Sequence, residues 1–525
     1  MPSRKGPPCR PPGCRPPGHA APLIPCLAAL CLFVLLAPAR PQATGSKATG
    51  SKATGASLAG PPQGASAAKS YPAPVIRQAT VYVTARNTGD RMRAQAPLPL
   101  EDLPQPEESM SLVMVDPTRR FQEIIGFGGA FTDAAAETFA KLPPAGRTEV
   151  LTAYFSPDKG LGYTLGQTSI NSCDFSSDTY SYDDTPGDTA LAHFSIAHDL
   201  KYRVPFIRAA LATAKAPFTL FASPWSPPAW MKTNGDMANG GHVKPEDRQA
   251  WADYYVRFIR AYRQQGIPVW GLTVQNEPMS TQSWESCLYT GQDEHDFVRD
   301  YLGPTLHRSG LANVKLMIWD HNRGIMYQRA QAVYEDPAAA RYVWGMAFHW
   351  YSGDHFDGPQ AVHEAFPEKG LLFTEGSEGF TADPAREWEI GERYGKNILL
   401  DLNHWAMGWT DWNLILDQRG GPNHVGNYCS APIMADTATG TLRYQPSYYY
   451  LGHFSKFIRP GARRIASTST DDSLLCSAFI NPNGTVAVVV LNLTGQARDY
   501  KIWLAGRAVT TTSPAHSIET ALLKP

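Results

Sequence analysis

Two glutamates in this sequence directly follow short apolar runs, so each would present its carboxyl group at the end of a strand. Glu277 closes the run Gly271-Leu-Thr-Val-Gln-Asn-Glu277 and is followed by Pro278. Glu375 closes Leu371-Leu-Phe-Thr-Glu375, and Gly376 behind it allows close approach to the backbone. Two carboxyl groups about 5–5.5 Å apart can cleave a glycosidic bond with retention: one protonates the leaving oxygen and the other attacks the anomeric carbon.

The two glutamates would need different environments to share this chemistry. A single glutamate after a strand is usually an ordinary loop carboxylate or a helix cap, whereas two at corresponding positions indicate a site. Glu277, as the acid, would need a raised pKa and an apolar or anionic setting. Glu375, as the nucleophile, would have to stay ionised and would need hydrogen-bond donors around it.

Eight strand candidates alternate with amphipathic helical stretches such as Arg248–Gln264, and this pattern predicts a (β/α)8 TIM barrel over residues 121–455. Polar or aromatic residues follow each strand, where such a barrel keeps its active site, and the two glutamates follow the fourth and seventh strands. An open doubly wound sheet is the alternative, but Gly126-Phe-Gly-Gly129 lacks the full dinucleotide-binding spacing. The candidates are Glu123–Phe127, Tyr163–Asn171, Phe218–Ser223, Val269–Gln275, Val314–Trp319, Val343–His349, Leu371–Thr374 and Met407–Trp412.

Strand-like segments flank the predicted barrel on both sides. Val75–Arg86 and Ser111–Val115 precede it, whereas Leu474–Ile480 and Val486–Leu493 follow it around the hairpin signal Asn481-Pro-Asn-Gly484. Because the C-terminal strands are too few to stand alone, we expect a side β-sandwich domain built from both chain ends, residues 73–120 and 456–525.

The N-terminal region resembles an export signal followed by a tether. Residues 1–43 carry basic residues, an apolar run from Leu23 to Ala37 and the small-residue site Ala37-Pro-Ala39. Residues 44–72 are rich in Gly, Ala and Ser and predict a flexible linker. The sequence therefore predicts a secreted or periplasmic protein without stable membrane insertion; an uncleaved anchor is the weaker alternative, because Pro25 interrupts a short run.

Charge and cysteine content exclude several classes of partner. The net charge of −1 argues against nucleic acid as a partner. Four cysteines lie in the leader, and Cys173, Cys287, Cys429 and Cys476 lack any metal-binding spacing, so we expect no metal and no cofactor. Disulfides and buried thiols remain equally open for these four, and the oligomeric state is not encoded in a readable pattern.

The segment from Gly126 to about Ser455 resembles glycoside hydrolase family 30 and, within it, the glucosylceramidases. The resemblance spans nearly everything after the first 70 residues, since the family pairs its barrel with a side β-domain made from both chain ends. It rests on Gly126-Phe-Gly-Gly-Ala-Phe-Thr-Asp-Ala134, Asn171-Ser-Cys-Asp-Phe175, Ala222-Ser-Pro-Trp-Ser-Pro-Pro-Ala-Trp-Met-Lys-Thr-Asn-Gly235, Asn276-Glu-Pro278, His349-Trp-Tyr351, Gly408-Trp-Thr-Asp-Trp-Asn413 and Leu451-Gly-His-Phe-Ser-Lys-Phe457.

The resemblance implies a retaining β-glycosidase with Glu277 as acid/base and Glu375 as nucleophile. It also implies that five residues hold the sugar in the −1 subsite: Asp174, Trp225, Asn276, Trp412 and Asn427. Asp174 can accept hydroxyl hydrogens, the tryptophans offer stacking faces, and Asn276 can donate to the 2-hydroxyl. Phe175, His349 and Tyr351 would lie nearer the mouth or, alternatively, pack beneath the site.

The chain departs from the family at Gln167, where members commonly carry an arginine. A neutral amide cannot help to keep Glu375 anionic, so either another cation substitutes or activity suffers. A β-glucoside such as glucosylceramide is the expected substrate. The alternatives are a β-1,6-glucanase or β-xylosidase of the same family and, in another class, a non-catalytic carbohydrate-binding protein.

Overall fold

The computed structural model describes residues 70–525 of the chain. The predicted export signal (residues 1–43) and all but the last three residues of the predicted linker (residues 44–72) lie outside the described residues. Within residues 70–525, no helix is both long and apolar enough to span a bilayer.

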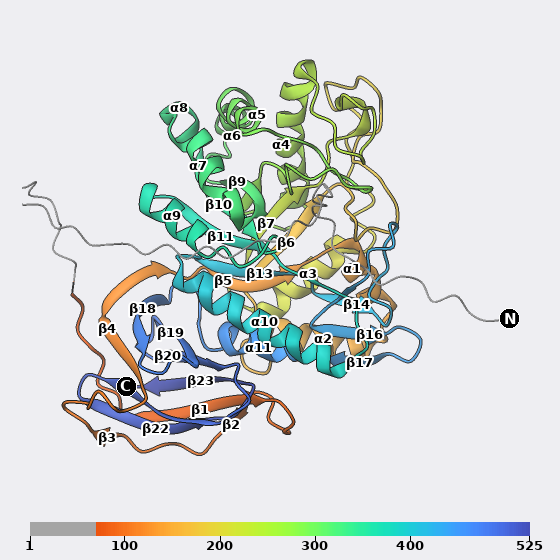
Figure 1. Ribbon diagram of the computed structural model, residues 1–525. Coiled ribbons are helices and arrows are strands. Elements are labelled where there is room, and N and C mark those ends of the chain that lie inside the picture. Colours follow the sequence, from red (N-terminus) through yellow and green to blue (C-terminus); the bar gives the residue numbers. More distant parts are fainter. Residues whose placement is uncertain (1–69) are drawn as a thin grey trace, which may run out of the picture. The chain divides into compact units, whose positions relative to one another are not determined.

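Eight parallel strands close into a barrel, which confirms the predicted fold class (Figure 1). The first strand lies three residues later than predicted because Glu123 still belongs to β4 (Leu112–Glu123), where it pairs with Arg463 of β18 (Arg463–Ser469). The barrel strands are β5 (Gly126–Ala130), β6 (Leu165–Ile170), β7 (Thr219–Pro224), β8 (Gly271–Thr273), β9 (Lys315–Asn322), β10 (Val343–His349), β11 (Gly370–Glu375) and β13 (Gly408–Asn413).

Helices connect the barrel strands and pack around them. The predicted helix Arg248–Gln264 is α4, and its buried residues, such as Trp251, Tyr255 and Phe258, recur at the three- to four-residue spacing of one helix face. The others are α1 (Asp133–Lys141), α2 (Pro144–Phe155), α3 (Arg203–Ala214), α5 (Gly291–Asp296), α6 (Gly303–Arg308), α7 (Met326–Tyr334), α8 (Pro337–Ala340), α9 (Asp357–Ala365), α10 (Pro384–Asn403) and α11 (Pro446–Ser455).

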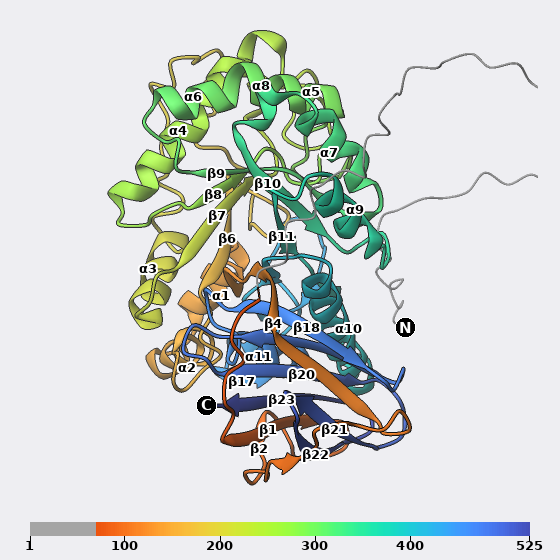
Figure 2. The same cartoon turned by 90° about the vertical axis from the view of Figure 1, so that its left-hand side faces the viewer.

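Strands from both chain ends join in one ten-stranded sheet beside the barrel, as predicted (Figure 2). All eight residues of β1 (Gln78–Ala85) pair antiparallel with β23 (Ser517–Lys524), so the two ends of the described chain lie side by side. The hairpin signal at Gly484, whose φ is 81°, joins β19 (Leu474–Ile480) to β20 (Val486–Asn492). The sheet is completed by β2 (Arg93–Ala94), β3 (Glu101–Asp102), β21 (Arg498–Leu504) and β22 (Arg507–Ser513).

Short strands close the loops that follow the last barrel strands. One pair joins β12 (Glu378–Gly379) to β15 (Cys429–Ser430). A three-stranded sheet is formed by β14 (Ile415–Asp417), β16 (Ile433–Asp436) and β17 (Thr441–Tyr444). These pieces hold the segment that carries Asn427 next to the segment that follows Glu375.

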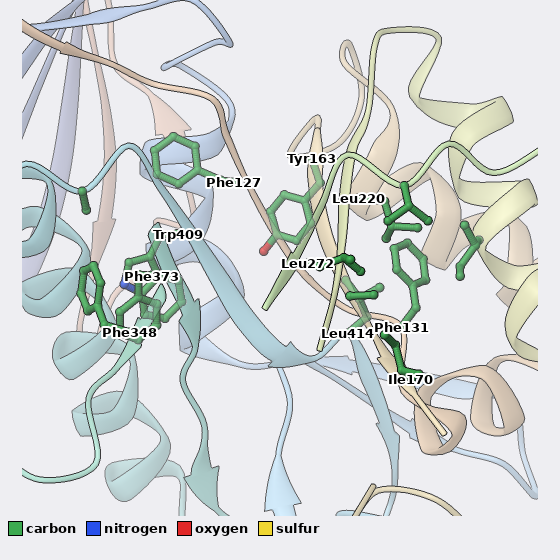
Figure 3. Close-up of a cluster of buried hydrophobic side chains, with 14 of the residues drawn as sticks. Phe127, Phe131, Tyr163, Ile170, Leu220, Leu272, Phe348, Phe373, Trp409 and Leu414 are labelled. Atoms are coloured by element: carbon green, nitrogen blue, oxygen red, sulfur yellow. The ribbon is translucent and has the colours of Figure 1, made fainter. Parts of the chain in front are cut away.

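Aromatic side chains fill much of the core around the barrel (Figure 3). Phe373 and Trp409 stack with ring centroids 4.2 Å apart, and Phe348 packs edge-on against Phe373 at 5.5 Å. Gly128 is required on β5 because a Cβ there would lie 1.6 Å from the carbonyl oxygen of Leu165 on β6. The glycine-rich motif therefore serves close strand contact.

The cysteines outside the predicted leader are buried in the fold. Cys173, Cys287 and Cys476 are free thiols, and Cys429 is buried as well. The sequence left open whether these cysteines form disulfides or are buried thiols. Cys173, Cys287 and Cys476 are buried thiols.

Candidate active site

The two glutamates lie at the carboxyl ends of the fourth and seventh barrel strands, as the strand count predicts. Glu375 is the last residue of β11 and is only 6% exposed. Glu277 follows β8, and its side chain is 16% exposed. Its backbone adopts a φ of 46°, and its N–H donates to the carbonyl oxygen of Asp320 over 3.0 Å. This unusual backbone conformation is thus held by a bond to the neighbouring strand.

Three barrel strands change register near their carboxyl ends, each by one extra residue. The extra residues are Asp320 on β9, Thr374 on β11 and Trp412 on β13. A bulge of this kind bends a strand and re-aims its side chains, and it is common beside active sites. The bulge at Thr374 immediately precedes Glu375 and helps to set the direction of its carboxyl group.

Asp320 connects the strands that carry the two glutamates. It is completely buried, and its carboxylate accepts hydrogen bonds from Thr273 of β8 and Thr374 of β11, each over 2.6 Å. A third bond joins its Oδ1 to Nε2 of His349 over 3.1 Å. Because each donor lies on a different strand, Asp320 fixes the relative positions of β8, β10 and β11 at the site.

His349 lies between Asp320 and Glu277, with its Nδ1 3.5 Å from Oε1 of Glu277. Burial alone would lower the pKa of this imidazole. The negative charge on Glu375, the hydrogen bond to Asp320 and the close contact with Glu277 outweigh burial and raise the pKa to about 10. His349 therefore supplies a positive charge among the acidic groups.

Tyr351 donates a hydrogen bond from its hydroxyl to Oε1 of Glu375 over 2.9 Å. Burial raises the pKa of Glu375 to about 8, and the charges on Glu277 and Asp174 act in the same direction, while His349 opposes them. The remaining oxygen, Oε2, is buried without a hydrogen-bond partner in the described part of the chain. Glu375 is therefore oriented through one oxygen and leaves the other available.

Two imidazoles flank Glu277. Burial would raise its pKa, but the charge of His321, 3.6 Å away, and the close contact with His349 and its charge lower it to about 2. That lowering depends on a protonated His321, whereas burial lowers the pKa of His321 itself. Near neutral pH, His321 is thus largely neutral. The pKa of Glu277 is then lowered less than it would be beside a charged His321.

The charges in this site run opposite to the order that the sequence predicts. The pKa of Glu277 is lowered and that of Glu375 is raised, although the acid role calls for a proton on Glu277. The difference arises from imidazoles that sequence reasoning did not place beside Glu277. Since the carboxyl groups titrate as an interacting pair, groups that bind beside them decide which one holds the proton.

Aromatic residues predicted to hold the sugar gather in one cluster. Trp225 and Trp412 stack with ring centroids 5.0 Å apart, and Phe175 packs edge-on against Trp412 at 6.2 Å. Trp284 and Phe380 pack against the same cluster from outside. The structure therefore brings together residues from four separate barrel loops.

Asp174 and Asn427 also meet, through a 2.9 Å hydrogen bond from Nδ2 of Asn427. Burial raises the pKa of Asp174 to about 7, while the bond from Asn427 opposes the rise. Asn276 precedes Glu277, and its Oδ1 is buried without a partner within residues 70–525. These amide and carboxyl groups are suited to exchange hydrogen bonds with sugar hydroxyls.

The three residues expected near the mouth differ in position. Phe175 and His349 are completely buried, so these two residues pack beneath the site. Tyr351 is 37% exposed while its hydroxyl reaches Glu375, so this residue links the mouth to the nucleophile.

Two groups of side chains in the described residues are close enough to share a cation. In the first, Glu277, His321 and His349 converge, but the acidic neighbours of His349 keep this imidazole protonated. In the second, Asp133, His198 and Asp199 converge, but Arg203 lies 2.7 Å from Asp133 and 3.3 Å from Asp199 and neutralises them. Both groups are therefore arranged around positive charges of the protein itself.

Comparison with known families decides the class of this barrel. Residues 124–458 match the glycosyl hydrolase family 30 TIM-barrel domain, and residues 461–521 match the family 30 beta sandwich domain. The chain belongs to glycosyl hydrolase family 30. It is therefore a glycoside hydrolase, and the alternative of a non-catalytic sugar-binding protein is not supported.

The family 30 chain is similar to glucosylceramidases and to endo-1,6-beta-glucanases. It is 39% identical to the lysosomal acid glucosylceramidase of Mus musculus over 434 residues, covering 78% of this chain and 83% of the relative. SrfJ from Salmonella typhimurium, known as a crystal structure, is 35% identical with a TM-score of 0.83, covering 86% of this chain and 100% of SrfJ. An endo-beta1,6-glucanase structure is 29% identical with a TM-score of 0.77 over the same shares.

Gln167, the departure from family 30 noted in the sequence, lies on β6 and is completely buried. Its Nε2 donates to Oγ of Ser223 over 3.2 Å, and its Oε1 has no partner among residues 70–525. The positive charge of His349 lowers the pKa of Glu375, but His349 belongs to the family motif His349-Trp-Tyr351 and does not replace the arginine.

Sequence reasoning missed four residues of this family 30 site: Asp320, His321, Gln282 and Trp284. Gln282 donates to Oε2 of Glu277 over 3.4 Å. The predicted fifth strand ended at Trp319, whereas β9 continues through the polar residues to Asn322. The rule that found Glu277, polar residues directly after an apolar strand run, also points to Asp320 and His321.

Proposed function

We propose that this protein is a retaining β-glucosidase that acts on glucosylceramide-type substrates. Glu277 is the acid/base and Glu375 the nucleophile. The observation that carries the proposal is the placement of Glu375, whose Oε1 is held by Tyr351 while its unpartnered Oε2 stands at the end of the seventh strand. Glu277 completes the pair from the fourth strand.

In the first step, a carboxylate oxygen of Glu375 attacks the anomeric carbon. The bond to the leaving oxygen breaks, and Glu277 gives that oxygen its proton, releasing the aglycone as an alcohol. In the second step, Glu277 takes a proton from a water molecule, whose oxygen attacks the anomeric carbon and breaks the ester to Glu375. Glucose leaves with its configuration retained, and Glu277 is protonated again.

Substrate binding favours the charge order that these steps need. A sugar hydroxyl donating to Glu375 would add to the bond from Tyr351 and stabilise the carboxylate. The proton of the pair then resides on Glu277, beside the neutral His321. Asp174, Asn427, Asn276 and the Trp225–Trp412 stack supply the contacts to the remaining sugar hydroxyls and ring face.

Exposed apolar side chains around the site favour a lipid aglycone over a glucan chain. Six large apolar side chains are exposed among residues 70–525, and four of them belong to the segments that follow the barrel strands β8, β9, β10 and β13. This apolar rim has exposures of 37–53% and would suit hydrocarbon chains better than further sugars. The rim consists of Met279, Ile325, Tyr351 and Tyr428.

A substrate panel tests the proposal. We expect turnover of nitrophenyl β-glucoside and of glucosylceramide in detergent, with a lower kcat/KM for β-1,6-glucan and nitrophenyl β-xyloside. The double variant M279S/Y428S should lower the ratio of kcat/KM for glucosylceramide to that for nitrophenyl β-glucoside. V75S, which changes an exposed apolar residue of the side domain, is the matched control. Preference for β-1,6-glucan would replace this function by the glucanase alternative.

The site of action follows from residues 1–43, which we propose direct export to the periplasm or the medium. N-terminal sequencing of the exported protein should find a start shortly after Ala39. A full-length protein retained in the cytoplasm would contradict export.

A further inference from the structure

His321 and Asn322 are the last two residues of β9. His321 places its Nδ1 3.6 Å from Oε1 of Glu277. The protonation state of this imidazole therefore acts directly on the proposed acid/base.

The hydrogen bonds around Asn322 determine which nitrogen of His321 carries a proton. Oδ1 of Asn322 accepts from the backbone N–H of Tyr351 over 2.6 Å, which fixes the orientation of the amide. Nδ2, which can only donate, then faces Nδ1 of His321 at 3.2 Å. Nδ1 must accept and carries no proton. The single proton of the neutral ring lies on Nε2, which is 3.2 Å from Oγ of Ser280.

We propose that Asn322 is a positioning residue that keeps His321 neutral, with its unprotonated Nδ1 toward Glu277, so that the acid/base retains its proton as substrate binds. This inference rests on the proposed role of Glu277. A protonated imidazole at this distance would stabilise the carboxylate and draw the proton away, whereas a neutral one does not.

The charged groups around His321 act on its pKa in both directions, and burial, which lowers the pKa, is the largest influence. Glu277 and Asp320 favour a protonated His321, whereas His349 and Arg329 of α7 disfavour it, and burial acts with the latter. Glu277 itself is faced by both imidazoles and by Gln282, and its charge acts on Glu375. The donor that Asn322 holds against Nδ1 acts in the same direction as burial, toward the neutral imidazole.

The same residues connect the two glutamates through hydrogen bonds. The hydroxyl of Tyr351 contacts Glu375, and its backbone N–H contacts Asn322, which contacts His321 beside Glu277. A displacement of the Tyr351 backbone would therefore alter both ends of the pair.

The substitution N322D tests this assignment with almost no change in shape. The new carboxylate still accepts from the N–H of Tyr351, but it now presents an acceptor to His321, which should gain a proton. The resulting cation beside Glu277 should move the alkaline limb of kcat/KM for octyl β-glucoside to lower pH by about one to three units. An alkyl leaving group is chosen because its departure requires the acid.

The same substitution in an H321Q background is the matched control. Without an imidazole, the added negative charge acts on Glu277 alone and should move the alkaline limb to higher pH. The sign of the shift thus reverses between backgrounds. No shift in N322D, or a downward shift of equal size in both backgrounds, would overturn the proposal.

Nitrogen NMR of the full-length protein with labelled histidine provides a test that needs no altered activity. We expect an unprotonated Nδ1 for His321 in the wild type at neutral pH, assigned by its loss in H321Q, and a protonated one in N322D. A doubly protonated His321 in the wild type would contradict the inference. The variant E277Q separates the two proposals. If the pH–rate profile of E277Q keeps its alkaline limb, the acid role of Glu277 fails. If E277Q loses that limb while N322D leaves it in place, only this inference about Asn322 fails.

Discussion

The hydroxyl of Tyr351 lies 2.9 Å from Oε1 of Glu375 and donates a hydrogen bond to it. This is the one side-chain hydrogen bond to the Glu375 carboxyl among residues 70–525. A donor stabilises the ionised carboxylate, so Tyr351 helps to prepare the proposed nucleophile from the mouth of the site.

The variant Y351F should therefore lower kcat/KM about ten- to a hundredfold, since a hydrogen bond to a charged group contributes about 1.5–3 kcal/mol. The pKa of Glu375 should rise, so the acidic limb of the pH–rate profile should move to higher pH. Y444F is the matched control, because it removes a 2.9 Å hydrogen bond to another carboxylate, Glu149, away from the glutamate pair. Equal effects of the two variants on the acidic limb would contradict this role.

Asp320 should prove essential although it does not face the substrate. D320N removes the charge that supports the protonated His349 and replaces an acceptor of three hydrogen bonds. We expect the pKa of His349 to fall and, with the cation lost near Glu375, the acidic limb to move to higher pH. The control D401N, which loses the ion pair with Arg323, should reduce thermal stability without moving that limb. An unmoved acidic limb in D320N would rule the role out.

Restoring the arginine that the family resemblance predicts should act in the opposite direction. In Q167R, a cation on β6 would stabilise ionised Glu375, so the pH optimum should stay in place or the acidic limb extend to lower pH. The pH–rate profiles of Q167R and the wild type show which of these two outcomes occurs. Retreat of the acidic limb to higher pH would contradict this expectation.

Acid sensitivity of the fold should arise partly from His453, which joins the barrel to the side domain. Its Nδ1 and Nε2 contact Thr520 of β23 and Thr84 of β1, each over 2.9 Å. Burial lowers its pKa from 6.5 to about 3, so the folded protein holds it neutral. The stability that the neutral imidazole contributes to the fold is fully present above pH 6.5. It is lost as pH falls toward 3, by about 1.4 kcal/mol per pH unit.

Urea unfolding of the wild type and H453Q between pH 7.5 and 4.5 measures this effect. Glutamine can donate and accept as the neutral imidazole does but cannot gain a proton, so H453Q should lose less stability on acidification. H193Q, at an exposed position, is the control. Parallel pH dependence in H453Q and wild type would exclude His453 as a source of acid sensitivity.

Much of the fold could be predicted because its patterns are local. Apolar runs bounded by polar residues located all eight barrel strands, and the Asn483-Gly484 turn located the hairpin of the side domain. The first barrel strand was displaced because residues up to Glu123 pair with β18, a contact across more than 300 residues that no local pattern reveals.

From local pattern alone, the candidate site was predictable only where residues follow strands directly, as Glu277 and Glu375 do. Asp174 and Trp412 were instead implied by the family resemblance. Asp320 was missed although it directly follows the predicted fifth strand, which ended at Trp319; the structure shows it as the extra residue of a bulge with a φ of 53°. The charge order of the glutamates depends on His321 and His349, and no local pattern in the sequence places these imidazoles beside Glu277.

Trapping of the glycosyl intermediate tests the central claim most directly. Incubation with 2-deoxy-2-fluoro-β-glucosyl fluoride, followed by proteolysis and mass spectrometry, should find the sugar on the peptide that contains Glu375, and E375Q should remain unlabelled. Label on any other residue, or hydrolysis that releases the inverted anomer first, would contradict the assignment of Glu375 as the nucleophile of a retaining β-glucosidase.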